Sequence, residues 1–175
     1  GHGQSEIKSV LGNAVNSIDF AIQQEQLGTG HAVGVATNEL ADFDGNLIVL
    51  FGDTPFISAR TMTKIENECK QADLVVLGFH PQDPTGYGRL VTKNKELLRI
   101  VEHNDANDDE LAITLCNSGV MAGSAVLIKK LLKELGRNNK NNEIYLTDCI
   151  ELANTEGLNG TYLTCDPTEA LGINS

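Results

Sequence analysis

The chain of 175 residues lacks an apolar run long enough to cross a membrane, and no basic region followed by an apolar stretch marks a signal peptide. Basic residues are also scarce, because 13 lysines and arginines stand against 24 aspartates and glutamates, for a formal net charge of −11. Such an acidic surface repels phosphate backbones, so we expect no nucleic-acid partner. Because no apolar run is long enough for a span, we also expect no membrane partner. A small nucleotide ligand is not excluded, because backbone N–H groups, a few local cations and a metal ion are enough to bind one.

Cysteine is limited to four residues, and they form no Cys-x-x-Cys pair and accompany no histidine cluster: Cys69, Cys116, Cys149 and Cys165. This spacing argues against a zinc site. Four cysteines could form two disulfides, but three of the four stand in apolar or helical surroundings. We therefore expect free, buried thiols and a cytoplasmic location, where thiols stay reduced.

Short apolar runs alternate with helical stretches along the chain, which is typical of an α/β fold. The length fits one domain, residues 1–175. Residues 46–51 are apolar on both faces, which predicts a buried parallel strand. The predicted strands are 19–23, 46–51, 74–79, 98–102, 113–116 and 161–165. The predicted helices are 5–11, 31–37, 58–70, 123–135 and 147–153.

The sequence Leu-Phe-Gly-Asp at residues 50–53 follows the clearest predicted strand. Ligands of open α/β sheets bind at the carboxyl ends of strands. An aspartate placed there, after a glycine that lets a ligand approach the backbone, is well sited to hold Mg²⁺ beside phosphates. Asp53 is thus a candidate metal ligand, and the alternative is an aspartate that merely ends a strand before Pro55.

Three further segments are candidates for ligand contacts. The turn Gly28-Thr29-Gly30 precedes a predicted helix, and Gln23 and Thr29 offer polar groups that suit a base edge; the alternative is a polar loop. Residues 83–89, Asp-Pro-Thr-Gly-Tyr-Gly-Arg, suit either a loop that closes over a cyclic ligand or a plain turn. Glu102 ends a predicted strand, where sugar hydroxyls would satisfy a buried carboxylate; the alternative is a solvated glutamate.

The order of these motifs carries more information than any one of them. The chain contains, in sequence, Glu-Gln-Leu-Gly-Thr-Gly-His-Ala, Gly-Asp-x-Pro, Asp-Pro-Thr-Gly-Tyr-Gly-Arg, Val-Glu-His-x-Asp-Ala, Asn-Ser-Gly and Tyr-Leu-Thr-Asp. This order resembles the uridyltransferase half of the family of bifunctional enzymes that act as N-acetylglucosamine-1-phosphate uridyltransferase and glucosamine-1-phosphate acetyltransferase. The resemblance extends over essentially the whole chain, including the opening Gly1-His2-Gly3.

The resemblance implies a Rossmann-like α/β domain with a mixed, mostly parallel sheet, and an enzyme that transfers a uridylyl group from UTP to N-acetylglucosamine-1-phosphate with Mg²⁺. It implies that Gln23, Gly28 and Thr29 contact the uracil, and that Phe51 and Gly52 line the nucleotide. Three residues would hold the N-acetylglucosamine moiety: Gly88, Glu102 and Asn117. The metal ligands would be Asp53 and Asn174, the latter from Glu169-Ala-Leu-Gly-Ile-Asn174.

One departure from the family bears on activity. The family begins with a glycine-rich Leu-Ala-Ala-Gly-x-Gly-Thr-Arg-Met loop that cradles the triphosphate, and no such sequence occurs here. The chain is therefore expected to be a partial domain, without the first strand-helix-strand and without the acetyltransferase domain, and to be inactive by itself. Two alternatives stay open: a non-catalytic module that binds a sugar or nucleotide, and a sister enzyme that acts on another hexose phosphate.

A consequence is predicted for the sheet. By the resemblance, the absent strands lie between the 19–23 strand and the 46–51 strand. Without them the most apolar strand has an unpaired edge, which is a template for pairing with another chain. We expect either a homodimer across this edge or an inward shift of residues 19–23 to pair with residues 46–51.

Overall fold

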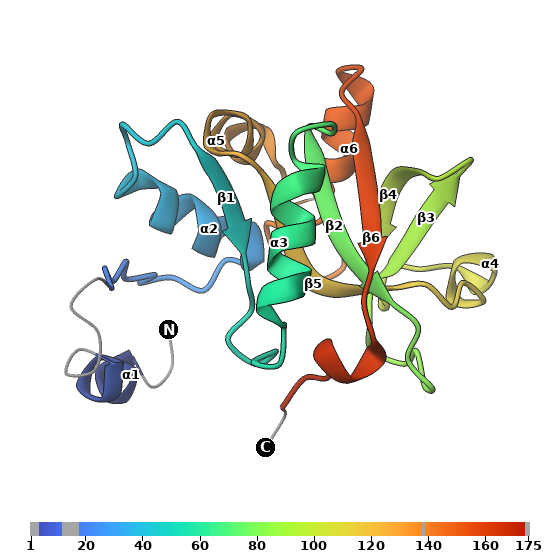
Figure 1. Cartoon of the computed structure of the whole chain (residues 1–175), viewed down its shortest axis with the longest axis horizontal. Helices are drawn as coiled ribbons and strands as arrows, with labels where there is room; N and C mark the ends of the chain where they lie inside the picture. Colours follow the sequence, from blue (N-terminus) through green and yellow to red (C-terminus); the bar gives the residue numbers. More distant parts are fainter. Residues whose placement is uncertain (1–3, 12–17, 138, 174–175) are drawn as a thin grey trace.

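Helices and strands alternate along the chain in a computed structural model that describes residues 4–11, 18–137 and 139–173 (Figure 1). The helices are α1 Gln4–Leu11, α2 Thr29–Asn38, α3 Ala59–Glu68, α4 Asp108–Leu111, α5 Ala125–Glu134 and α6 Asp148–Thr155, followed by a 3₁₀ turn at Pro167–Glu169. The strands are β1 Asn46–Val49, β2 Leu74–Phe79, β3 Arg89–Lys93, β4 Glu96–Val101, β5 Cys116–Ser124 and β6 Gly160–Thr164.

These strands form one mixed sheet in the order β4-β3-β5-β2-β6, with β1 also paired to β5. The long strand β5 organises the sheet, because it is antiparallel to β1, β2 and β3. Strands β2 and β6 are parallel. The predicted α/β fold with a mixed sheet is confirmed, but the expectation of a mostly parallel sheet is wrong for the described strands.

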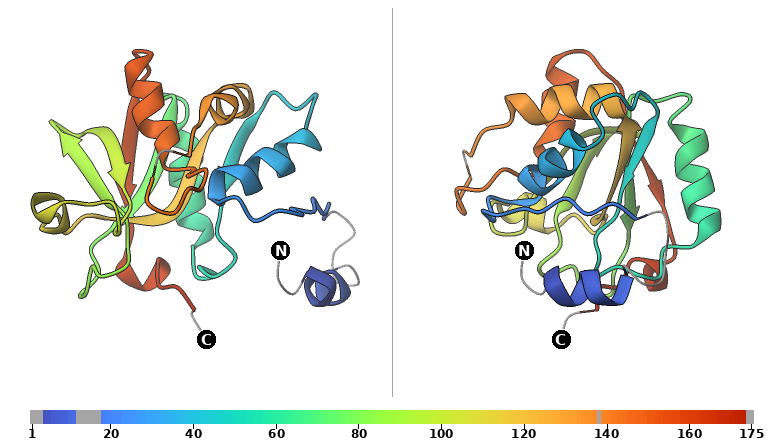
Figure 2. Two further views of the ribbon diagram at one scale, coloured as in Figure 1. Left: turned by 180° about the vertical axis from the view of Figure 1, so that it is seen from behind. Right: turned by 90° about the vertical axis from the view of Figure 1, so that its left-hand side faces the viewer.

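Helices cover both faces of the sheet, as the two views in Figure 2 show. Strand β2 has no exposed residue, and its side chains alternate between two cores. Leu74 and Val76 pack in the cluster that includes residues of α5 and α6, whereas Val75 and Leu77 pack in the cluster that includes Ile65 of α3. Any strand between two layers of helices needs apolar side chains on both faces, whether its neighbours are parallel or antiparallel. The apolar pattern therefore indicated burial on both faces, and it did not indicate parallel pairing.

Most predicted elements are present with shifted ends. Ser58 caps α3 by accepting a hydrogen bond from the Thr61 N–H, as predicted, and Ser124 caps α5 in the same way. The strand predicted at residues 113–116 instead begins at Cys116 and continues to Ser124. Strand β3 was not predicted; it pairs with β4 around the turn that holds Asn94 and Lys95 at positive φ.

Strand β1 differs most from expectation. It is antiparallel to β5, and its burial is only partial. Among the described residues β5 is its one strand partner, so its other edge carries no strand. Residues 19–23 form no strand and do not pair with β1, so the predicted inward shift is wrong; the chain there keeps a non-repetitive path below α2 (Figure 1). A homodimer across this edge stays a prediction.

The edge of β1 borders an apolar hollow of about 470 Å³ between this strand and α2. The turn that follows α2 is bound by Lys129 of α5, whose ammonium group donates hydrogen bonds to the carbonyl oxygens of Leu40, Ala41 and Phe43. These carbonyls belong to the turn after α2, which ends at Asn38, and a charged donor makes stronger hydrogen bonds with them than a neutral one would. The lysine therefore joins α2 to the main body of the protein.

The four cysteines are free thiols, as predicted; Cys116 and Cys149 are buried and the other two are half-buried. Burial raises the pKa of the Cys149 thiol to about 12 and that of Cys165 to about 11. Both therefore stay protonated and unreactive at neutral pH. Among the described helices, none has the length and apolar character to cross a membrane.

Candidate functional site

A cavity of about 440 Å³ opens at one end of the sheet, where the chain leaves several strands. In Figure 1 the loop after β1, the loop between β2 and β3 and the C-terminal segment all lie at the lower end of the sheet. The cavity is lined by residues from seven separate segments: Thr29; Phe51, Asp53 and Thr54; Thr85 to Gly88; Glu102; Asn117 to Gly119; Asn141, Tyr145 and Thr147; and Gly172. Six of the ten residues predicted from the sequence line it, namely Thr29, Phe51, Asp53, Gly88, Glu102 and Asn117.

The loop after β1 presents Phe51 and Asp53 to the cavity. Thr54 closes the turn, because both its backbone N–H and its hydroxyl donate to the carbonyl of Phe51, at 3.2 and 3.0 Å. The Phe51 ring rests on Gly119, where φ is +85° and an added Cβ would lie 2.5 Å from a ring carbon. A glycine is therefore required at residue 119 for two reasons, its backbone conformation and the approach of the ring.

The backbone of Asp53 also fixes the C-terminal segment. Its carbonyl oxygen accepts a hydrogen bond from the Ile173 N–H at 2.7 Å. Upstream, the Glu169 carboxylate accepts from the Ser58 N–H at 2.9 Å, and this bond lowers the pKa of Glu169. The segment thus returns to the loop that bears Asp53. The predicted second metal ligand, Asn174, lies outside the described residues.

Glu102 follows directly after β4 and is half-buried, as the strand-end position predicted. Its Oε1 accepts a hydrogen bond of 2.8 Å from the Thr147 hydroxyl. Burial raises the pKa of Glu102, an effect that the Thr147 bond opposes and the nearby Asp105 reinforces. A Cβ at Gly88 would lie 3.3 Å from Glu102 Oε2, so the glycine leaves this carboxylate open to the cavity.

Asn117 is the second residue of β5 and lies beside Gly88. Its backbone N–H donates to the Gly88 carbonyl at 2.9 Å, which joins β5 to the loop before β3. Its side-chain oxygen accepts from the Gly119 N–H at 3.1 Å, so the amide NH₂ group is the end that can donate to a ligand. Asn117, Gly88 and Glu102 therefore form one polar wall of the cavity, and their contact with a sugar stays a prediction.

The segment Gly28-Thr29-Gly30, of which Gly28 and Thr29 are predicted to contact the uracil, is packed closely against residues 144–146. Gly28 precedes α2 with φ at +109°, and an added Cβ would lie 2.5 Å from the Ile144 carbonyl oxygen. The Gly30 N–H donates to that same carbonyl at 2.8 Å, so this backbone donor is used within the protein. Thr29 lines the cavity while its hydroxyl accepts from the Leu146 N–H at 3.0 Å. The glycines thus serve close backbone packing.

Three other predicted residues do not line the cavity: Gln23, Gly28 and Gly52. The Gln23 side chain donates to the Gly28 carbonyl at 3.2 Å and lies 3.1 Å from His31 Nδ1, so it supports the loop before α2. Gly52 is exposed and has open space around its Cα. Their predicted contacts with a nucleotide stay predictions.

The segment before α6 supplies three lining residues for which no role was predicted: Asn141, Tyr145 and Thr147. Tyr145 and Thr147 belong to the Tyr-Leu-Thr-Asp motif. Because this motif is part of the family resemblance, it could have indicated both residues as candidates for the site. Asn141 lies in a polar loop, and no pattern in the sequence distinguishes it from its neighbours. Burial raises the pKa of the Tyr145 hydroxyl, which keeps it protonated and able to donate.

Carboxylates gather behind this wall. Burial, followed by the charges of Glu102, Glu151 and Asp105, raises the pKa of Asp148 to about 6. Asp105 accepts from the Lys140 N–H through Oδ1, at 3.1 Å, while its buried Oδ2 has no hydrogen-bond partner among the described residues. Glu102 is the carboxylate of this group that lines the cavity, and the negative charge gathered around it disfavours phosphates on this side.

A single carboxylate, that of Asp53, is the described metal-ligand candidate in the cavity, and the described part of the chain contains no cluster of three or more His, Cys, Asp or Glu suited to hold an ion. Mg²⁺ commonly uses one or two protein carboxylates, with phosphate oxygens and waters completing its shell. The exposed Asp53 fits that mode of binding together with a nucleotide. It does not fit a metal site built from protein groups alone.

Comparison with known proteins identifies relatives over the whole chain. A bifunctional protein GlmU from Ruegeria sp. (strain TM1040) is 46% identical over 175 residues, which is all of this chain and 39% of that protein. A bifunctional protein GlmU from Roseobacter denitrificans is 47% identical over 176 residues, again with 39% of that protein covered. The chain thus spans well under half the length of these relatives. No model of a protein family matches it.

Solved structures confirm the fold. A nucleoside-diphosphate-sugar pyrophosphorylase from Vibrio cholerae RC9 superposes with a TM-score of 0.72 at 15% identity, over 96% of this chain and 70% of that one. A putative glucose-1-phosphate thymidylyltransferase from Bacillus anthracis superposes with a TM-score of 0.68 at 19% identity, over 92% of this chain and 63% of that one. The resemblance identified from the motifs and the expected α/β fold with a mixed sheet are both confirmed.

Proposed function

We propose, on the premise that this chain is related over its whole length to the bifunctional GlmU proteins, that its cavity is the substrate site of an N-acetylglucosamine-1-phosphate uridyltransferase. The substrates are UTP and N-acetylglucosamine-1-phosphate, and the cellular location is the cytoplasm. One observation carries the proposal: residues from motifs far apart in the sequence, including Asp53, Glu102 and Asn117, line a single cavity.

The lining residues offer groups that suit both substrates. Glu102 and Asn117 offer a carboxylate acceptor and an amide donor, the pair of groups that binds sugar hydroxyls and an acetamido group. Thr29 lies at the start of α2, and Phe51 brings an aromatic ring to the cavity. Both support the predicted contacts with the uracil and the nucleotide.

Asp53 is the residue that would hold Mg²⁺ together with nucleotide phosphates. When bound, the ion supplies positive charge that offsets the charge of the transferring phosphoryl group. Asn174 is the second proposed ligand; in the sequence it follows Ile173, whose N–H donates to the Asp53 carbonyl. Both residues act here as ligands and not as nucleophiles.

The proposed reaction needs no covalent intermediate on the protein. A phosphate oxygen of N-acetylglucosamine-1-phosphate forms a bond to the α-phosphorus of UTP, the bond from that phosphorus to the bridging oxygen breaks, and pyrophosphate leaves. The residues of the cavity contribute by holding both substrates in line. Glu102, already bonded to Thr147, would orient the sugar and not take part in proton transfer.

Ligand binding tests the proposal directly on the 175-residue chain. We expect isothermal titration calorimetry to detect the binding of UDP-N-acetylglucosamine, and we expect the affinity to increase when Mg²⁺ is added. Asp53→Asn should abolish the Mg²⁺-dependent increase and leave the circular dichroism spectrum unchanged. Glu102→Ala should lower the affinity for N-acetylglucosamine-1-phosphate about tenfold or more, because the sugar hydroxyls lose a charged acceptor. Wild-type protein that is folded but binds neither ligand would refute the proposal.

Turnover is a separate question. The sequence contains no Leu-Ala-Ala-Gly-x-Gly-Thr-Arg-Met loop, so these 175 residues lack the proposed cradle for the β- and γ-phosphates. Loss of one charge-stabilising donor typically lowers a rate on the order of 10²–10³-fold. We therefore expect no useful release of pyrophosphate from UTP and N-acetylglucosamine-1-phosphate. Turnover near that of an intact relative would contradict this expectation.

A further inference from the structure

The loop between α5 and α6 forms a wall of the cavity that the sequence did not predict. Its Asn141 lines the cavity next to Tyr145 and Thr147. We propose that Asn141 is a specificity-determining residue that recognises the acetamido group of the sugar. This inference rests on the proposed function, and it concerns a residue to which neither the motifs nor the comparisons assign a role.

The loop is built to hold Asn141 in one place. Asn139 bridges it, because its side-chain amide donates to the Glu143 carbonyl at 2.6 Å while its side-chain oxygen accepts from the Glu143 N–H at 3.1 Å. Asn142 takes a positive φ of 53°, which turns the chain back. An asparagine adopts this left-handed conformation more readily than most residues. The loop is therefore a defined turn with Asn141 near its apex.

Contacts on both sides attach this loop to the rest of the site. Lys140 binds the turn after β4, since its backbone N–H donates to Asp105 and its ammonium group donates to the Asn104 carbonyl. On the other side, the Ile144 N–H donates to the Leu27 carbonyl at 2.7 Å. The loop is thus bonded both to the turn after β4, which follows Glu102, and to the segment before α2, and these two attachments fix its position.

The side chain of Asn141 is only partly used within the protein. Its amide nitrogen donates to the Tyr145 hydroxyl at 2.8 Å, which is the one hydrogen bond of this side chain among the described residues. One N–H and the carbonyl oxygen stay available. An acetamido group presents a carbonyl acceptor and an N–H donor, so a side-chain amide can satisfy both at once.

The neighbouring groups cannot do the same. The free atoms of the Glu102 carboxylate only accept, and the free end of Asn117 only donates, because its oxygen is bonded to the Gly119 N–H. Each of these groups suits a hydroxyl as well as an amide. Of these three side chains, Asn141 is the one that keeps both a donor and an acceptor, which match the carbonyl and the N–H of an acetamido group and have no such pair to meet in a single hydroxyl at the same carbon.

The test compares two ligands that carry the same nucleotide, UDP-N-acetylglucosamine and UDP-glucose, by calorimetry on the 175-residue chain. For Asn141→Ala we expect about a tenfold loss of affinity for UDP-N-acetylglucosamine and a change within about twofold for UDP-glucose. Asn67→Ala, an exposed asparagine on α3, serves as the control and should change neither. Circular dichroism confirms that each variant is folded.

A double-mutant cycle with Tyr145→Phe tests whether the two side chains act together. Because Asn141 is held by the Tyr145 hydroxyl, the combined variant should lose less discrimination than the two single variants added. Equal losses for both ligands in Asn141→Ala, or no loss for either, would overturn the inference. A wild-type chain that binds both ligands equally well would also overturn it while leaving the proposed function standing. A wild-type chain that binds neither would overturn both.

Discussion

Asp148 makes the stability of this protein depend on pH in a direction that can be worked out from the structure. Its pKa is raised to about 6 by burial and by the charges of Glu102, Glu151 and Asp105. A carboxyl group whose pKa is higher in the folded state than in the unfolded state binds a proton more tightly when folded. The free energy of unfolding should therefore increase as the pH falls through about 6, and the gain is complete only near the unfolded pKa of about 4.

The size of the effect follows from the same shift. The difference between 3.8 and about 6 corresponds to about 3 kcal/mol for the full titration. About half of that is realised between pH 8 and pH 5, because the unfolded group is still ionised at pH 5. Since Asp148 is only partly buried, solvent screening lowers the expected gain further, to ~1 kcal/mol.

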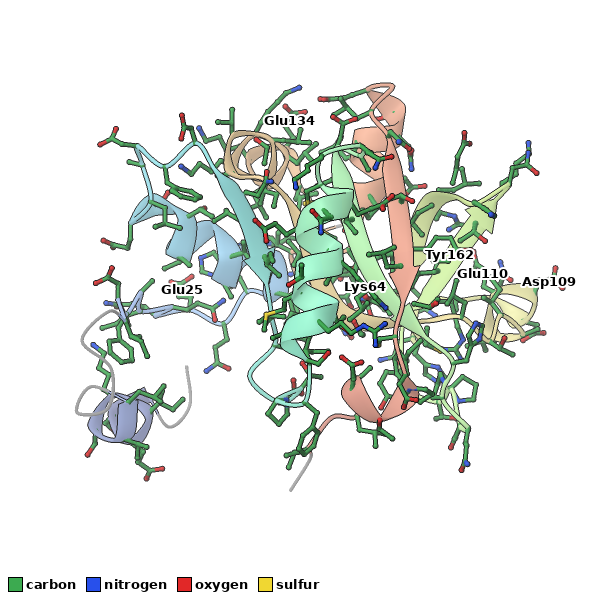
Figure 3. All side chains as sticks on the ribbon, viewed as in Figure 1. Glu25, Lys64, Asp109, Glu110, Glu134 and Tyr162 are labelled. Atoms are coloured by element: carbon green, nitrogen blue, oxygen red, sulfur yellow. The ribbon has the colours of Figure 1, made fainter. Side chains whose placement is uncertain are left out.

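The assay is urea unfolding followed by far-ultraviolet circular dichroism at pH 8, 7, 6 and 5, because the chain has no tryptophan to report by fluorescence. In Asp148→Asn, the change in the free energy of unfolding between pH 8 and pH 5 should be smaller than in the wild type by ~1 kcal/mol. Asp109→Asn is the matched control, since it removes one negative charge from an exposed site at the start of α4, labelled in Figure 3. Its curve should run parallel to that of the wild type.

Two results would refute this reasoning. Parallel curves for the wild type and Asp148→Asn would mean that this carboxylate is well solvated despite its acidic neighbours. A wild-type protein that loses stability between pH 7 and pH 5, with Asp148→Asn losing less, would mean that the group is stabilised as an anion, for instance by its position in the first turn of α6.

Three further outcomes are expected. Lys129→Met should lower the free energy of unfolding by ~1 kcal/mol in urea unfolding, because three carbonyls in the turn after α2 lose a charged donor, whereas Lys133→Met should have little effect. Gly119→Ala should destabilise more than Gly157→Ala, since both have positive φ but only the first would meet an aromatic ring; equal losses by calorimetry would contradict the close contact. The open edge of β1 should drive self-association seen by sedimentation at raised concentration, and Ile48→Lys should suppress it; a wild type that stays monomeric would count against the homodimer.

Local chemistry in the sequence was enough for the parts of the fold that depend on near neighbours. Ser58 and Ser124 precede their helices and cap them, as serine does wherever it can accept from the first-turn N–H groups. The apolar run at residues 74–79 became a fully buried strand. The ordered motifs identified the family, and relatives at 46% and 47% identity over the whole chain confirmed it.

The direction of the strands could not be obtained in this way. A strand between two layers of helices must be apolar on both faces whether its neighbours run parallel or antiparallel, so the pattern of residues 46–51 did not distinguish the two. Strand β5 is antiparallel to three neighbours because of how the whole chain passes through the sheet. Direction is a property of pairing between distant segments, and no local pattern encodes it.

The same division holds within the site. From the sequence alone, Asp53, Glu102 and Asn117 could be identified by their motifs and by their positions at strand ends, and the structure brings them to one cavity. Only the tertiary structure showed that Gly28 is required by the Ile144 backbone, with an added Cβ only 2.5 Å from its carbonyl oxygen. Only the tertiary structure placed Asn141 in the cavity wall, because a polar loop acquires a position through the distant groups that bind it.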